Sequence, residues 1–269
     1  MYDRNFLTAT VAEFFGPFAL CIAGIGAIIS TQGLDDGGNL VAVALAHGLA
    51  IGLMIAALGH ISGGHFNPAV SISMLATGEI GLPRAIAYIV AQLLGAVAGA
   101  GLLTFVFPAL GPLGRNNAGV NLGLPGLGPD VTVNGALIME VVMTFFLVLV
   151  IFGSAVDPRG PKAIAPLAIG LTITMDILTG GRISGAAMNP ARAFGPAIVQ
   201  QDFTNWWIYW VGPIVGGLIA GLAYKYVWLP RNPVPAPVVR RPSTDAPAAV
   251  APRPAPAPPQ PQRRSSRRR

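Results

Sequence analysis

Two copies of the tripeptide Asn-Pro-Ala, at Asn67-Pro68-Ala69 and at Asn189-Pro190-Ala191, are the most distinctive chemical feature of this 269-residue sequence. Asparagine is a preferred helix N-cap because its side-chain oxygen accepts from the first free backbone N–H groups. Proline fits the next position, where an N–H would have no partner within the helix. Each tripeptide therefore predicts the start of a helix with a positive N-terminal end and an asparagine amide free to donate.

A few charged side chains lie inside otherwise apolar segments. Arg192 directly follows the second tripeptide, where a permanent charge is costly unless it faces water. Glu13 and Glu140 interrupt apolar runs and need hydrogen-bonding partners for the same reason. Paired acids also suit a proton relay, so an ion-coupled transporter remains an alternative. Asp176 is a further such acid, expected in an outer vestibule or against a neighbouring subunit.

The composition indicates that these residues lie in a membrane protein. Hydrophobic residues make up 53% of the chain and charged residues 10%, whereas soluble domains carry about 25% charged residues. The mean hydropathy of +0.61 agrees. So few charges cannot cover a water-facing surface, which argues against a cytosolic enzyme, a nucleic-acid-binding module or a disulfide scaffold. The single cysteine, Cys21, excludes an internal disulfide.

Six segments are apolar over the roughly 20 residues that a membrane helix needs. They cover about 8–29, 40–58, 85–107, 133–152, 163–178 and 206–228. Two further apolar segments, 67–76 and 189–199, follow the asparagines and are too short to cross. Each of these predicts a re-entrant half-helix buried in protein or lining a water-filled cavity.

The order of these segments repeats, because corresponding features of 8–107 and 133–228 are separated by 121 to 125 residues. Each half holds an odd number of spans, so the second half enters from the opposite face. This predicts an all-α membrane protein with six transmembrane helices and two half-helices in an inverted repeat, whose centre lies near the midplane. The two half-helices then meet N-terminus to N-terminus, and their positive ends repel cations.

The segments His60–Val70 and Met188–Arg192 resemble the paired signatures of the aquaporin (major intrinsic protein) family. The resemblance is specific because two Asn-Pro-Ala copies stand at equivalent places of a six-span inverted repeat, and it covers about 6–229. It implies the aquaporin fold and a passive water channel that excludes protons and ions, assembled as a homotetramer with one pore per subunit. It also implies that Glu13 and Glu140 accept hydrogen bonds from the re-entrant loops.

The family's narrowest ring has four positions, which its spacing transfers to His47, Ile177, Ala186 and Arg192. This ring resembles that of vacuolar-type (tonoplast) members, which implies a wider constriction that passes ammonia, hydrogen peroxide or urea besides water. A histidine at 47 that only bonds two helices is the alternative. The resemblance places His65 in the inner vestibule.

Other positions bear on substrate and chemistry. Glycerol facilitators usually carry Asp where this chain has Ala193, and Tyr209-Trp210 is similar to the aromatic pair of water-selective members. Both favour water, with a glycerol or neutral-solute facilitator as the alternative. An adhesion or junction protein is a further alternative, which the intact asparagines disfavour. Ala186 replaces the cysteine that mercury attacks in some relatives, so we expect mercury resistance. Neither an enzyme, a cofactor nor a metal site is indicated.

The net charge of +6 divides unevenly along the chain. Residues 230–269 hold nine arginines, one acid and twelve prolines, which makes this segment +8 and residues 1–229 −2. We expect 1–229 to form the channel domain and 230–269 a disordered tail. The tail either binds anionic lipid or only fixes topology. The excess of Lys and Arg on the side of the termini makes both cytoplasmic. Short loops and the Arg/Pro-rich tail indicate a bacterial inner membrane, with a vacuolar-type membrane as the alternative.

Overall fold

The computed structural model describes residues 4–31, 38–108 and 122–229, which contain helices but no strands. In chain order the α-helices are α1 Arg4–Ser30, α2 Gly38–Ser62, α3 Pro68–Ala76, α4 Leu82–Val106, α5 Val133–Ile151, α6 Ala165–Gly180, α7 Pro190–Gln200 and α8 Ile208–Ala223. Two π-helical turns, η2 Phe152–Val156 and η4 Tyr224–Trp228, extend α5 and α8, and a 3-10 turn, η3 Lys162–Ile164, precedes α6.

Six helices within these ranges are long and apolar enough to cross a membrane, as the sequence predicts. Five of them are longer than the predicted spans; α1, for example, begins at Arg4 and α2 continues to Ser62, whereas the last span, Ile208–Trp228, begins two residues later than predicted. Hydropathy marks only the part of a helix that lies in hydrocarbon, while backbone hydrogen bonding continues the helix into the polar interface. The predicted division into a channel domain and a tail stays a prediction, because 230–269 lies outside the described residues.

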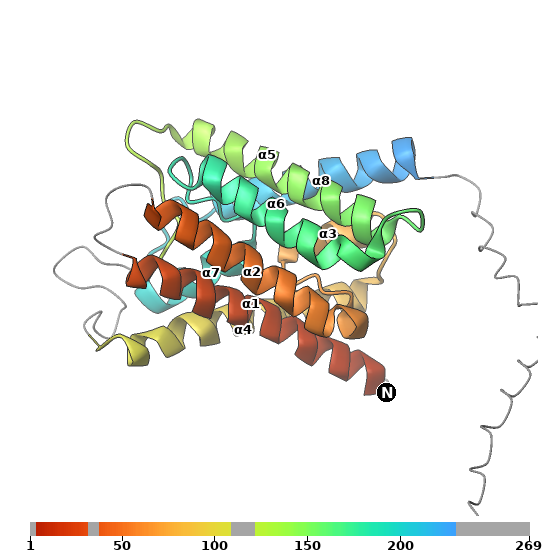
Figure 1. The fold of residues 1–269 in the computed structure, drawn as a ribbon, viewed down its shortest axis with the longest axis horizontal. Helices are drawn as coiled ribbons and strands as arrows, with labels where there is room; N and C mark the ends of the chain where they lie inside the picture. The colour runs from red at the N-terminus through yellow and green to blue at the C-terminus, as the bar shows by residue number, and fades with distance from the viewer. Residues whose placement is uncertain (1–3, 32–37, 109–121, 230–269) are drawn as a thin grey trace, which may run out of the picture. The chain divides into compact units, whose positions relative to one another are not determined.

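Two pairs of helices pack in equivalent ways, α1 against α4 and α5 against α8 (Figure 1). A Cβ added to Gly95 would lie 2.0 Å from the carbonyl oxygen of Phe14, and one added to Gly216 would lie 2.1 Å from that of Val141. These crossings need glycine because the backbones touch. They are 121 residues apart, like the other equivalent features of the two halves.

The two half-helices, α3 and α7, pack on the opposite halves of the repeat. The first-half helix α3 lies against α8, and the second-half helix α7 lies against α4. Between the halves, α2 packs on α6, where Gly48 and Gly170 approach each other's backbone. The N-terminal end of α1 and the C-terminal end of α8 lie at one end of the helix bundle (Figure 1), as an even number of spans requires.

Candidate functional site

The two half-helices meet at their capped N-termini. The Oδ1 atoms of Asn67 and Asn189 accept from the backbone N–H groups of Ala69 and Ala191, each at 2.9 Å. Each N-cap residue is extended, and a proline follows it, as the sequence predicts. The positive ends of α3 and α7 therefore face a common centre.

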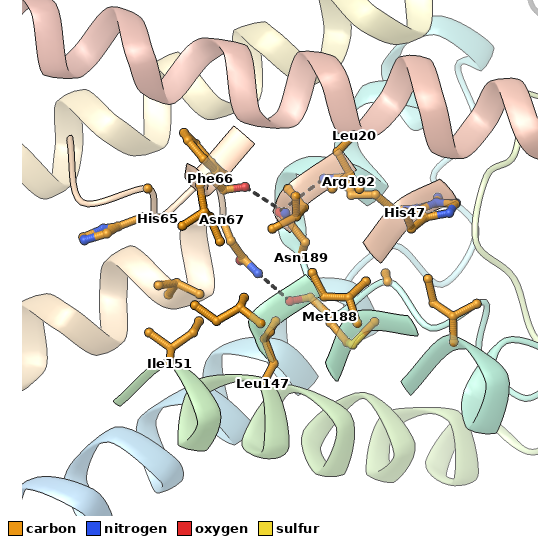
Figure 2. A pocket seen from close by; sticks show the side chains of 18 of the residues that line it. Leu20, His47, His65, Phe66, Asn67, Leu147, Ile151, Met188, Asn189 and Arg192 are labelled. Atoms are coloured by element: carbon orange, nitrogen blue, oxygen red, sulfur yellow. Dashed lines mark hydrogen bonds between the residues drawn. The ribbon is translucent and has the colours of Figure 1, made fainter. Parts of the chain in front are cut away.

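The asparagine amides also tie the halves together, which the sequence did not predict. Asn67 Nδ2 donates to the Met188 carbonyl at 2.8 Å, and Asn189 Nδ2 donates to the Phe66 carbonyl at 2.9 Å (Figure 2). The expectation of an entirely free amide is therefore too simple. An NH₂ group has two N–H bonds, so each amide keeps one for a molecule in the lumen.

The residues that accept these bonds have an uncommon backbone conformation. Phe66 and Met188 have φ values of 49° and 51°, in the left-handed region that non-glycine residues rarely adopt. Such a conformation persists only when the surroundings hold it in place. The two buried glutamates supply that support.

Glu13 is completely buried and accepts four hydrogen bonds from the first re-entrant loop and its surroundings. They come from Ser62 Oγ (2.6 Å), His65 N (2.9 Å), Phe66 N (2.7 Å) and Gln92 Nε2 (2.7 Å). A carboxylate with this many donors is stabilised without a basic partner. The contacts match the loop-supporting role that the family resemblance implies.

Glu140 repeats this arrangement for the second loop. It accepts from Ser184 Oγ at 2.7 Å, Ala187 N at 2.9 Å and Met188 N at 2.7 Å, and it is also completely buried. Since the oxygens of both glutamates accept from fixed donors, neither acid is presented to the lumen as a proton carrier.

Sequence reasoning missed the residues that complete these supports. Tyr88 OH donates to the Ser62 carbonyl at 2.7 Å, and Tyr209 OH donates to the Ser184 carbonyl at 2.9 Å. The offsets of 122 for the serines and 121 for the tyrosines lie within the range of the other equivalent features, so aligning the two halves would have found them. Tyr209 thus supports the second loop.

A cavity between the half-helix tips is lined by equivalent residues of the two halves (Figure 2). Most of the pairs are alike: Leu20 and Leu147, Ile51 and Ile173, Ile55 and Ile177, Phe66 and Met188, and Asn67 and Asn189. The middle of the lumen therefore combines apolar walls with the two asparagine amides. Apolar walls hold water weakly, so the amides are its principal hydrogen-bonding partners there.

The equivalence fails at the two ends of this cavity. His47 and Arg192 lie at one end, and their counterparts 122 residues away, Ile169 and Val70, are apolar. At that end the lumen is polar and positively charged. By the predicted topology this is the outer end.

The four predicted ring residues lie together at this end. His47, Ile177, Ala186 and Arg192 all line the central cavity, and three of them, all except Ala186, also line a second, more open cavity. Residues shared by two adjoining cavities mark the constriction between them. The structure thus brings together, from α2, α6, α7 and the loop before α7, the residues that the family spacing assigns to a ring.

Arg192 is held by two neighbours across this constriction. Its Nη1 donates to the Gly123 carbonyl at 2.7 Å, and its Nη2 lies 3.4 Å from Nε2 of His47. Nε of the buried guanidinium has no hydrogen-bond partner among the described residues. The guanidinium lines the lumen, and its charge repels cations.

The His47 imidazole has a defined orientation. Its Nδ1 lies 2.8 Å from the Val43 carbonyl, which can only accept, so Nδ1 carries the proton. In the neutral ring Nε2 is then an acceptor for Arg192. His47 therefore bonds within α2 and to Arg192 of α7 while it also lines the lumen.

His65 lines the same cavity at the opposite end from Arg192 (Figure 2). Its Nδ1 lies 3.1 Å from Ser71 Oγ, and its ring meets that of Tyr88 edge to face at 5.3 Å between centroids. The position agrees with the inner vestibule expected for His65.

Asp176 lines neither of these two cavities. It is 2% exposed on α6, and its Oδ2 has no hydrogen-bond partner among the described residues. The expectation that it faces an outer vestibule or a neighbouring subunit is therefore wrong, because the side chain is buried within the subunit. The structure offers no functional explanation for this acid.

A charged cluster joins the turn after α5 to η4, the turn that ends the last span. Arg159 Nη2 lies 2.6 Å from Asp157 Oδ2 and donates to the Trp228 carbonyl at 2.7 Å. Hydrogen bonds from Arg159 hold the pKa of Asp157 below its usual range. Lys225 Nζ donates to the Thr77 carbonyl at the end of α3. These contacts fix the ends of two helices near the start of the predicted tail.

Among the described residues, no group of three or more His, Cys, Asp or Glu side chains could hold a metal ion. The buried glutamates are surrounded by backbone and hydroxyl donors, which suit a carboxylate but not a cation.

The comparisons with known proteins agree with this geometry. The sequence profile described as "Major intrinsic protein" matches residues 1–224. The probable aquaporin TIP3-2 of Arabidopsis thaliana is 43% identical over 236 residues, which cover 83% of this chain and 85% of the relative. The lens fiber major intrinsic protein of Lithobates pipiens is 42% identical over 228 residues, which cover 84% and 83%.

A solved structure shares the fold. The X-ray structure of the aquaglyceroporin from Plasmodium falciparum superposes with a TM-score of 0.70 at 25% identity, covering 82% of this chain and 96% of that one. Several similar relatives are TIP-type aquaporins of plants, which confirms the expected resemblance to the tonoplast branch. Given this match over most of its length, the chain belongs to the major intrinsic protein family.

Proposed function

We propose that this protein is a passive water channel that excludes protons and other ions. The observation that carries the proposal is the meeting of two capped half-helices, each with an asparagine amide at the centre of one lumen. A water molecule that accepts from both amides has its two hydrogens directed away from the centre, toward opposite ends of the lumen. It cannot pass a proton to the next water in the same line, while the helix ends repel hydronium.

Arg192 and His47 supply the second barrier. A buried guanidinium next to a neutral imidazole repels cations and offers donors to a neutral molecule. The proposed selectivity filter is the ring of His47, Ile177, Ala186 and Arg192. With Ala186 small, an imidazole rather than a phenyl ring at position 47 and isoleucine at position 177, we propose that ammonia, hydrogen peroxide and urea also pass.

A glycerol facilitator of the same fold is the second candidate. It is favoured by the likeness to the aquaglyceroporin structure. The position after Arg192 is occupied by Ala193 rather than Asp, which favours water. Tyr209, half of the aromatic pair that also favoured water, is 2% exposed and bonded to the second loop, so it adds less to that preference.

Osmotic flux separates these candidates. Purified protein in liposomes should accelerate shrinkage under a sucrose gradient over empty liposomes, as followed by stopped-flow light scattering. Isosmotic uptake of urea, glycerol and ammonia on the same vesicles gives the solute range, with glycerol uptake expected to be the slowest of the three. Glycerol uptake as fast as urea uptake would favour the facilitator, and no acceleration of shrinkage would remove the water channel.

The proposal also covers the membrane location, the oligomeric state and the topology of the channel. The protein is an integral multi-pass membrane protein, and we propose a homotetramer with cytoplasmic termini, whose tail lies near anionic lipid. The proposed bacterial inner membrane rests only on the short loops and the tail. The relatives named above come from a plant and an amphibian and lend it no support. Chemical cross-linking in membranes tests the tetramer, and liposome binding with and without 230–269 tests the tail.

A further inference from the structure

Gly24 of α1 lies directly against the imidazole of His47. A Cβ added to Gly24 would lie 2.3 Å from Nε2 of that ring and 2.5 Å from both Cδ2 and Cε1. Distances this short require one of the two groups to move. The imidazole therefore occupies the space that a side chain at position 24 would fill.

The same ring has two further contacts. Its Nδ1 donates to the Val43 carbonyl at 2.8 Å, and its Nε2 lies 3.4 Å from Arg192 Nη2. His47 also lines both cavities that meet at the constriction. Since the ring both contacts α1 at Gly24 and lines these cavities, we infer that a ring displaced by a side chain at position 24 moves toward the lumen.

The other half of the repeat lacks this arrangement. With the offset of 127 that relates Glu13 to Glu140, the counterpart of Gly24 is Ile151. With the offset of 122, the counterpart of His47 is Ile169. Both isoleucines line the central cavity. In the first half, glycine at position 24 accompanies the imidazole at position 47. In the second half, where isoleucine replaces the imidazole, the position equivalent to 24 also carries an isoleucine.

We propose that Gly24 is a positioning residue that sets the width of the narrowest part of the pore. Its missing side chain lets the His47 ring lie against α1, beside Arg192 and clear of the lumen. The proposal rests on the proposed function and specifies what determines solute size within it. A methyl group at position 24 displaces the imidazole into the lumen, which hinders larger solutes more than water.

The test compares Gly24→Ala with Gly26→Ala, His47→Ala and the double variant Gly24→Ala/His47→Ala in proteoliposomes. A Cβ at Gly26, on the same helix, meets nothing within 4 Å, so this variant is the matched control. The readout is the ratio of urea to water permeability, with ammonia as the smaller solute. Gly24→Ala should lower the ratio of urea to water permeability about tenfold. This factor corresponds to the free energy of forcing one side chain, here His47, off its rotamer. Gly26→Ala should leave it unchanged.

The double variant locates the cause. Without the imidazole, adding the methyl group should not change the permeability ratio relative to His47→Ala alone. An unchanged or raised ratio in Gly24→Ala, or an equal fall in both backgrounds, would overturn the proposal. If Gly24→Ala does not fold, recovery of folded protein in the double variant supports the clash, and failure in both backgrounds overturns it.

Thermal unfolding separates this proposal from the proposed function. If wild-type vesicles show no water flux above empty ones, the proposed function fails. Melting temperatures then test whether Gly24 accommodates the His47 imidazole. Gly24→Ala should melt below wild type, whereas the double variant should melt with His47→Ala. Equal losses in both backgrounds would show that the imidazole is not what Gly24 accommodates.

Discussion

Replacement of Glu140 by alanine removes the acceptor that holds the second re-entrant loop. The backbone N–H groups of Ala187 and Met188 lose their partner inside the protein, and Ser184 loses the acceptor of its hydroxyl. A buried donor left unpaired costs about 1–3 kcal/mol, so the two backbone groups alone cost about 2–6 kcal/mol. In a chain of this size that lowers the melting temperature by on the order of 10 °C.

The assay uses the chain's single cysteine, Cys21, which is fully buried in α1. A thiol-reactive dye added to detergent-solubilised protein reports its exposure as the protein unfolds. Glu140→Gln keeps one acceptor oxygen, so its melting temperature should lie between those of wild type and Glu140→Ala. The exposed Glu79 gives the control, because Glu79→Ala is expected to change stability by less than about 0.5 kcal/mol. A melting temperature for Glu140→Ala equal to that of Glu79→Ala would refute the supporting role of Glu140.

Three further predictions concern the lumen and the inner turn. Arg192→Val introduces the valine that occupies the equivalent position 70 in the first half. It should raise proton and urea permeability while water still passes. An unchanged proton leak, measured with an interior pH dye, would count against the charge barrier. The pKa of Asp157 is lower in the folded protein than in the unfolded chain. Asp157 therefore stabilises the folded protein above about pH 4, and this contribution is lost as the pH falls through the folded-state pKa. Asp157→Asn should therefore lower the melting temperature at pH 7, and a difference that persists at the lowest pH would contradict this. Mercuric chloride should not inhibit water flux, because Ala186 lines the constriction and Cys21 is buried. Marked inhibition that Cys21→Ala does not remove would contradict the predicted resistance.

Hydropathy and repetition in the sequence predict most of the fold. Six apolar segments and two short ones, in two series about 122 residues apart, were enough to predict the spans and the re-entrant half-helices. The same offset pointed to the facing asparagines at 67 and 189. These features are local in the sequence or periodic along it, so no knowledge of tertiary contacts was needed to find them.

Contacts that depend on the packed structure were not predicted. The bond from Asn67 to the Met188 carbonyl joins residues that only the fold brings together. Gln92 donates to both Glu13 and Ser71, but the residue 121 positions later is Pro213, so the repeat gave no signal for it. The predicted location of Asp176 was wrong because its position in the sequence does not indicate which side of α6 becomes buried.

Simultaneous measurement of water and proton movement tests the central claim most directly. Proteoliposomes that contain an interior pH-sensitive dye are mixed with an osmotic gradient, and shrinkage and internal pH are recorded together. The account predicts shrinkage faster than in empty liposomes, no change in its rate when a pH gradient is imposed, and no proton leak above that of the lipid. Shrinkage at the rate of empty liposomes, or water flux accompanied by protons, would contradict it.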